Sequence, residues 1–275
     1  MKMRMKLVAG ISVAMICLNV FAQSTPKTVD EVMVLSGLKE QLTRLDGTIA
    51  SKIDEKKSTF PKPEQFEQFK TIMTTGLNSK NAEKYFAEYL EKYSKEDSLK
   101  LVATLFNNPF MQEFNLIEKE AAAPEKQPEM IAFFQTLKDT PPASGRVQQL
   151  ISLNQEMRTS ELALKMVQNL ILSMIKGVNL TQPKDKQISD AELKGKLASS
   201  FPANFEQQMA NQFLAYSLFT YKNVPDEKLN RYIEVWKTPT GKYGLDRLLN
   251  AFDYSFSKMS EITGSSFSIL EKNKK

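Results

Sequence analysis

The sequence predicts an all-α fold, a helical array or bundle in which two similar helical halves pack together. Two observations lead to this prediction. Apolar residues recur every three or four positions along most of the chain, which is the period of an amphipathic helix. Gly is scarce, with 10 residues in 275, and Pro and capping residues divide the apolar stripes into segments of helix length.

The first 22 residues have the plan of a secretory signal peptide. Cationic residues stand at the front, an apolar run follows from 7 to 20, and Ala22 offers a small residue for cleavage. We expect cleavage after Ala22 and a periplasmic or secreted bacterial protein that is not an integral membrane protein once the signal is removed. Cys17 lies inside the apolar run without the small residue that lipid attachment needs before it, so no lipid anchor is expected.

The N-terminal helical half is predicted to cover residues 23–140. Its first helix should run from about residue 29 to 54, because Thr28 to Glu31 has the spacing of a capping box and one apolar stripe follows it. Pro residues then separate shorter helices. One of these should start near Pro109, and a short one is expected at 129–137.

The C-terminal helical half is predicted to cover residues 141–266. It should begin with one long or kinked helix that Gly177 caps at its C-terminal end. The last two helices are expected from Pro225 to about Lys237 and from Pro239 to about Thr263. Residues 267–275 should form a basic tail.

The two halves resemble each other in sequence. At a constant offset of 130, the matching pairs are Leu99 with Leu229, Phe106 with Trp236 and Pro109 with Pro239. Each passage reads as an acidic-capped helix, an aromatic residue, a Pro joint and another helix. An internal duplication explains this pattern, although unrelated amphipathic helices also resemble one another.

Composition excludes several kinds of chemistry. The chain contains no His, and its only Cys lies in the signal segment, so imidazole catalysis, thiol catalysis and disulfides are not expected in the mature protein. No calcium-loop motif is present, and we expect neither a metal site nor a cofactor. Without the signal segment the chain has 34 Lys and Arg against 32 Asp and Glu, a mixed charge that argues against nucleic acid as a partner.

The segment from 232 to 242, Tyr-Ile-Glu-Val-Trp-Lys-Thr-Pro-Thr-Gly-Lys, carries a family resemblance. It resembles the bacterial secreted, all-helical family of unknown function whose repeated signature is an aromatic pair, Ser/Thr-Pro, any residue and Gly. Trp236, Pro239 and Gly241 occupy the signature positions. The segment 106–111 fits less well because it lacks the Gly. The resemblance implies an all-helical periplasmic domain with no established activity.

The same segment has two interpretations. The structural one is a joint between helices, with Thr238 as the cap and Pro239 as the first residue of the next helix. The functional one is an anion site at the free amides of that helix start. The residues of this alternative site are Trp236, Lys237, Gly241 and Lys242. A Walker phosphate loop is not supported, because the Gly expected five residues before Gly241 is missing.

The favoured function is a non-catalytic binding or protein-interaction module of the bacterial envelope. An envelope protein, a peptide or a lipid is the expected partner, and Met157, Met166 and Met174 are either core residues or the lining of an apolar groove. The alternative is a carboxylate-based hydrolase of periplasmic glycan, with Glu234 and Asp246 as the acidic pair. Aromatic residues at 85–93 are expected in the core.

Overall fold

The computed structural model describes residues 28–137, 139–179, 184–199 and 201–272. Within these ranges the chain forms α-helices and short 3-10 turns without any strand, so the all-α prediction is confirmed. The predicted signal peptide, 1–22, with its cleavage site after Ala22, lies outside the described residues.

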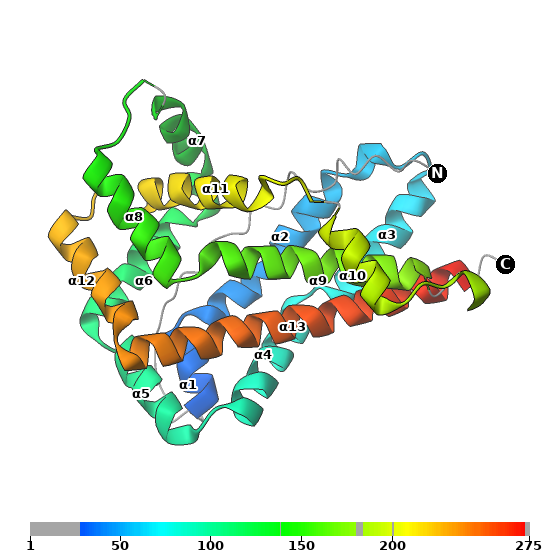
Figure 1. The fold of residues 1–275 in the computed structure, drawn as a ribbon, viewed down its shortest axis with the longest axis horizontal. Coiled ribbons are helices and arrows are strands. Elements are labelled where there is room, and N and C mark those ends of the chain that lie inside the picture. The colour runs from blue at the N-terminus through cyan, green and yellow to red at the C-terminus, as the bar shows by residue number, and fades with distance from the viewer. Residues whose placement is uncertain (1–27, 138, 180–183, 200, 273–275) are drawn as a thin grey trace.

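The helices fall into two series that a short helix connects (Figure 1). The first series is α1 (Thr28–Leu35), α2 (Leu38–Asp54), α3 (Pro63–Gly76), α4 (Ser79–Tyr93), α5 (Glu96–Phe106) and α6 (Pro109–Ala121). The connecting helix is α7 (Gln127–Thr136). The second series is α8 (Ser144–Glu156), α9 (Thr159–Asn179), α10 (Asp190–Ala198), α11 (Phe205–Thr220), α12 (Asp226–Lys237) and α13 (Pro239–Lys272). The 3-10 turns are Lys57–Thr59, Pro124–Lys126 and Lys184–Lys186.

The two series repeat one packing pattern. Helix α1 packs on α5 as α8 packs on α12, and α2 packs on α4 as α9 packs on α11. The backbone bonds at the joints repeat as well. The amide of Asn108 donates to Leu105 at 3.2 Å, and the amide of Thr238 donates to Val235 at the same distance. The similarity seen in the sequence therefore extends to the structure of the helix joints.

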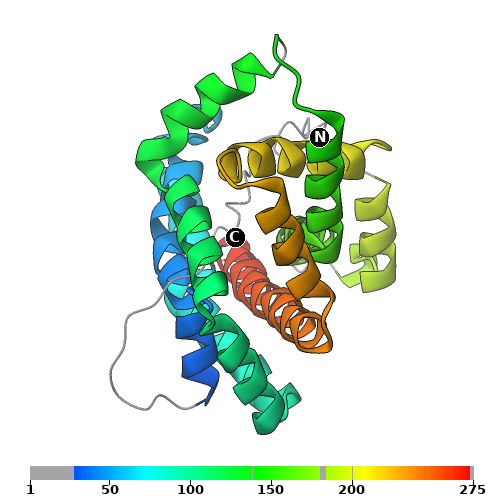
Figure 2. The ribbon, with the colours of Figure 1, turned by 90° about the vertical axis from the view of Figure 1, so that its left-hand side faces the viewer.

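The last helix joins the two halves into one core. Helix α13 packs along α9 of its own half and also against α3, α4 and α5 of the first half, while α6 packs against α11 (Figure 2). The main cluster of buried apolar side chains draws on both series, from Val29 in α1 to Met259 in α13. The predicted boundary near residue 140 therefore separates two helix series that share a core.

Two predicted helices are broken by left-handed residues. The helix expected from 29 to 54 ends at Leu35 and restarts at Leu38, because Gly37 has a φ of 61°. The long helix expected up to Gly177 is likewise divided between α8 and α9 at Arg158, which has a φ of 52°. A left-handed residue after a helix lets backbone amides donate hydrogen bonds to the last free carbonyls of that helix. It also redirects the chain into the next helix.

Two predicted helix ends were too early. Helix α9 runs to Asn179, so Gly177 lies inside the helix instead of capping it. Helix α13 runs to Lys272, past the expected end at Thr263, so the predicted tail 267–275 is helical over its first part. The buried face of α13 explains its length, because contacts with α3 and α9 support the helix beyond its own propensity.

Candidate functional site

The joint between α12 and α13 has the predicted cap. Thr238 is extended, with φ −65° and ψ 155°, and its Oγ1 accepts a hydrogen bond from the amide of Gly241 at 3.0 Å. Pro239 is the first residue of α13, where the missing N–H costs nothing. Capping and proline geometry therefore account for this turn.

Both Gly residues after the joint are explained by close packing. A Cβ at Gly241 would lie 2.2 Å from the carbonyl oxygen of Val235, so the turn leaves no room for a side chain. A Cβ at Gly244 would lie 3.2 Å from both methyl carbons of Val102, where α13 crosses α5. The two glycines thus permit one tight turn and one close helix crossing.

The predicted anion site is not assembled around an open space. Trp236 is 2% exposed, and its ring lies between Phe106 and Tyr232, at centroid distances of 6.2 and 5.7 Å. The amide of Gly241 already donates to the cap. Lys237 binds Glu234 at 2.7 Å, and Lys242 is exposed. The geometry of this corner favours the structural interpretation.

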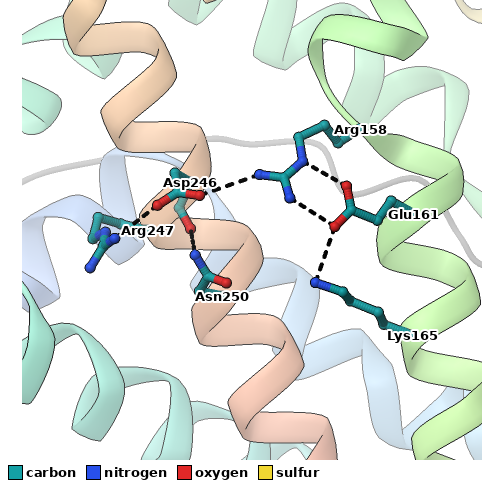
Figure 3. Close-up of polar contacts among 6 residues, drawn as sticks. All are labelled: Arg158, Glu161, Lys165, Asp246, Arg247 and Asn250. Atoms are coloured by element: carbon teal, nitrogen blue, oxygen red, sulfur yellow. Dashed lines mark hydrogen bonds and ion pairs between the residues drawn. The ribbon is translucent and has the colours of Figure 1, made fainter.

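The two carboxylates of the hydrolase hypothesis bind different cations. Glu234 lies on the exposed face of α12 beside Lys237. Asp246 lies on α13 between Arg158, at 3.3 Å, and Arg247, at 2.8 Å (Figure 3). Neither arrangement is that of an acid held beside an ionised nucleophile in one cleft.

A network of charged side chains ties the start of α9 to α13 (Figure 3). Arg158 donates two hydrogen bonds of 2.7 Å to Glu161 and a longer one to Asp246. Lys165 binds Glu161 from the next turn at 3.1 Å. The hydrogen bonds from Arg158, supported by Lys165, lower the pKa of Glu161 to about 2. Glu161 therefore stays ionised and serves as a fixed anchor for both cations.

A polar cleft of about 280 Å³ lies next to this network. Its lining residues are Tyr89 from α4, Asn169 from α9, and Asn250, Asp253, Tyr254 and Ser257 from α13. On α13, Asp253 and Tyr254 follow Asn250 by three and four positions, and Ser257 follows them by four and three, which places all four on one face of the helix. Helix α13 forms the floor of the cleft, and α4 and α9 form its walls.

Internal hydrogen bonds fix the orientation of the cleft side chains. Asn169 Nδ2 donates to Asp253 Oδ1 at 2.9 Å, across the space between α9 and α13. Asn250 Nδ2 donates to the backbone carbonyl of Asp246 at 2.8 Å, on the side of α13 that faces α9 (Figure 3). Neither of these bonds uses the Oδ1 atom of its Asn. All six lining residues are half-buried, so they are held in place yet reachable from solvent.

Two tyrosine rings, Tyr89 and Tyr254, line the cleft, and Tyr93 packs beside them without being part of the lining. Tyr89 lies 4.8 Å from Tyr93 and 5.7 Å from Tyr254, measured between ring centroids, and Tyr93 is 47% exposed. A hydrogen bond to Glu88 raises the pKa of Tyr254 to about 12, and burial raises the pKa of Tyr89. Both phenols are therefore neutral near pH 7. The prediction that the aromatic residues at 85–93 are core holds for Phe86, and Tyr85 and Tyr89 are partly buried against the core. It is wrong for Tyr93, which is exposed at the end of α4.

Sequence reasoning also missed a buried carboxylate. Glu118 on α6 is 1% exposed, and its Oε1 accepts hydrogen bonds from the hydroxyls of Tyr221, at 2.6 Å, and Tyr232, at 2.8 Å. This group joins the first half to the second without opening to solvent. Its position in the sequence indicates its burial, because Glu118 lies on the same face of α6 as the buried residues Met111 and Phe114.

Comparison of the chain with protein-family models, curated proteins and solved structures found no match. The resemblance based on Trp236, Pro239 and Gly241 therefore stays a prediction. Across the described residues, no helix is long and apolar enough to cross a membrane. The same residues contain no group of three or more acidic side chains placed to hold a metal ion.

Proposed function

We propose that this protein is an exported, non-catalytic binding module of the bacterial envelope, and that its ligand binds in the cleft between α4, α9 and α13. The observation that carries the proposal is the cleft itself, where an aromatic wall faces oriented amide and hydroxyl groups. Ligand sites are concave, and a few placed polar groups in them fix the orientation of the ligand. The signal-like segment, 1–22, supports export.

The state of the acidic groups favours binding over hydrolysis. Asp246 is neutralised by two arginines, Asp253 accepts from Asn169, and Glu88 accepts from Tyr254. A glycoside hydrolase needs two carboxyls about 5 to 9.5 Å apart, one of them held protonated. Each of these three carboxyls is already bonded to a donor of the protein, and none is paired with a second carboxyl in the contacts described.

The cleft lining also narrows the class of ligand. A lipid tail or an apolar peptide face requires a groove lined by aliphatic and aromatic side chains. Amide, carboxylate, hydroxyl and phenol groups line this cleft instead. An apolar ligand would leave these polar groups without water or partners, which disfavours it. We therefore propose a polar ligand rather than a lipid.

Native mass spectrometry of the mature protein, purified from its own envelope, tests the proposal. We expect a retained mass that is reduced in the variant Tyr89→Ala and unchanged in Asn230→Ala. Asn230 is an exposed residue of α12 and serves as the matched control, because it bonds only to Gln149 among the contacts described. A ligand-free wild-type protein, or a retained mass indifferent to Tyr89→Ala, would contradict the proposal.

A further inference from the structure

The aromatic wall of the cleft has the chemistry that binds the apolar face of a sugar ring. The C–H groups on one face of a pyranose pack against an aromatic ring, as flat ligands do on stacking platforms. Tyr89 and Tyr254 offer two such rings in the cleft, with centroids 5.7 Å apart and planes inclined by 47°. Both side chains are partly exposed, so a ring face is open to a ligand.

The floor and the opposite wall have the chemistry that binds sugar hydroxyls. Each hydroxyl both donates and accepts hydrogen bonds, and it is best matched by groups that offer both functions. Asn169 and Asn250 each carry a carbonyl oxygen beside their amide donors, and Ser257 adds a hydroxyl. Their internal bonds orient them before a ligand arrives, which reduces the entropy lost on binding.

Most of the charged side chains around the cleft are paired. Arg158 and Arg247 neutralise Asp246, Lys165 binds Glu161 at 3.1 Å, and Lys258 binds Glu261 at 3.0 Å. A site for phosphate or carboxylate groups would present unpaired cations, and a site for amines would present unpaired carboxylates. The lining holds one carboxylate, Asp253, which accepts from the neutral amide of Asn169 and is bound by no cation in the contacts described, so the cleft disfavours an acidic ligand.

From these three features we infer that the cleft binds an oligosaccharide without acidic groups, with a sugar ring stacked on Tyr89 and its hydroxyls bonded to Asn169 and Asn250. The inference rests on the proposed function and adds the chemical class of the ligand. The cleft volume, about 280 Å³, is just below the range of about 300 to 1,000 Å³ typical of small-molecule sites. The site therefore holds part of a glycan chain, and the rest continues over the exposed surface.

Isothermal titration calorimetry of the full chain with three neutral probes tests this inference. The probes are cellotetraose, maltotetraose and tetra-N-acetylchitotetraose, which differ in linkage and substituents. We expect at least one of them to bind. Tyr89→Ala should then weaken binding at least tenfold, whereas Tyr89→Phe, which keeps the ring, should stay within threefold of the wild type. Asn250→Ala should weaken binding about three- to tenfold, the effect of one lost hydrogen bond.

Two controls separate a binding effect from a folding effect. Asn230→Ala removes an exposed amide that does not line the cleft, and it should leave binding unchanged. The fluorescence of the buried Trp236 should be the same in all variants, because none of the substitutions touches its pocket. Binding that survives Tyr89→Ala would overturn the assigned site.

Failure of the inference and failure of the proposed function give different results. If none of the three probes binds at millimolar concentration while native mass spectrometry still finds a retained mass that depends on Tyr89, the carbohydrate class is overturned and the binding module stands. If no probe binds and no mass is retained, both are overturned.

Discussion

The two halves of the molecule build the same helix joint from different residues. Gly37 joins α1 to α2, and Arg158 joins α8 to α9, each as a left-handed residue directly before the next helix. The amide of Gly37 donates to Val34 at 2.7 Å, and the amide of Arg158 donates to Gln155 at 3.1 Å. Left-handed backbone costs a non-Gly residue about 1 to 2 kcal/mol. The second half accepts this cost at the position whose side chain anchors α9 to α13 beside the cleft.

Helices α6 and α13 show a second difference between the halves. Both begin at a Pro, so their third and tenth residues can be compared directly. The third residue is the buried Met111 in α6 and Gly241 in α13, and the tenth is the buried Glu118 in α6 and Leu248 in α13. At the tenth position, α6 therefore carries a buried carboxyl side chain where α13 carries an apolar one. At the third position, α13 carries a Gly where α6 carries an apolar side chain.

The largest effect is expected from breaking the buried link that Glu118 of the first half makes to the second half. Glu118→Ala should reduce the free energy of unfolding by about 4 kcal/mol, because two buried phenol donors lose a partner at about 1 to 3 kcal/mol each. Chemical denaturation followed by the fluorescence of Trp236 measures this change. The variant Glu118→Gln keeps an acceptor and should lose less. A loss below about 1 kcal/mol for Glu118→Ala would show that the buried link does not hold the halves together.

The next largest effect is expected at the turn between α12 and α13, where Gly241 leaves no room for a side chain. Gly241→Ala should destabilise the protein by about 3 kcal/mol, because the added Cβ would meet the backbone oxygen of Val235 at 2.2 Å. Gly47→Ala is the matched control in α2, where a Cβ would have nothing within 4 Å. Gly47→Ala should stabilise the protein by about 0.5 to 1 kcal/mol, because Ala has a higher helix propensity than Gly. Equal changes in the two variants, measured by thermal unfolding, would refute the packing argument.

The difference between the halves also shows what sequence can predict. Hydrophobic period and proline positions were sufficient for most helices and for the joint at Thr238, because both depend on residues close in sequence. The break at Gly37 was missed because the apolar stripe continues through it. Arg158 carries no sequence mark of its left-handed backbone. The cleft could not be predicted, since it depends on how α4 and α9 flank α13, which long-range packing decides.

The strained joint offers a smaller test of the same comparison. Arg158→Ala keeps the left-handed backbone and removes the ion pairs, whereas Arg158→Gly removes both the strain and the pairs. We expect the Gly variant to be more stable than the Ala variant by about 1 kcal/mol, the cost of left-handed backbone. Urea denaturation of the two variants measures the difference. If both unfold at the same urea concentration, Arg158 is not strained.

The smallest effect is the pH dependence of the ion pairs that Arg158 makes. Hydrogen bonds from Arg158 and Lys165 lower the pKa of Glu161 to about 2, below its usual value of 4.5. A carboxyl with a lowered folded-state pKa stabilises the protein fully above its unfolded pKa, and this contribution is lost as the pH falls toward the folded value. Glu161→Gln should therefore be less stable than the wild type near pH 7, by less than about 1 kcal/mol because the pairs are exposed.

Unfolding free energies measured between about pH 7 and pH 2.5 should show this difference closing below about pH 4.5. The same substitution in the Arg158→Ala background distinguishes the source of the effect. With the guanidinium removed, only Lys165 still binds Glu161, so the gap between the Glu and Gln forms should shrink across the whole range. If the stability difference caused by Glu161→Gln is as large in the Arg158→Ala variant as in the wild type, Lys165 accounts for the stabilisation of Glu161. The ion pair with Asp246 would then be the only one through which Arg158 stabilises the protein.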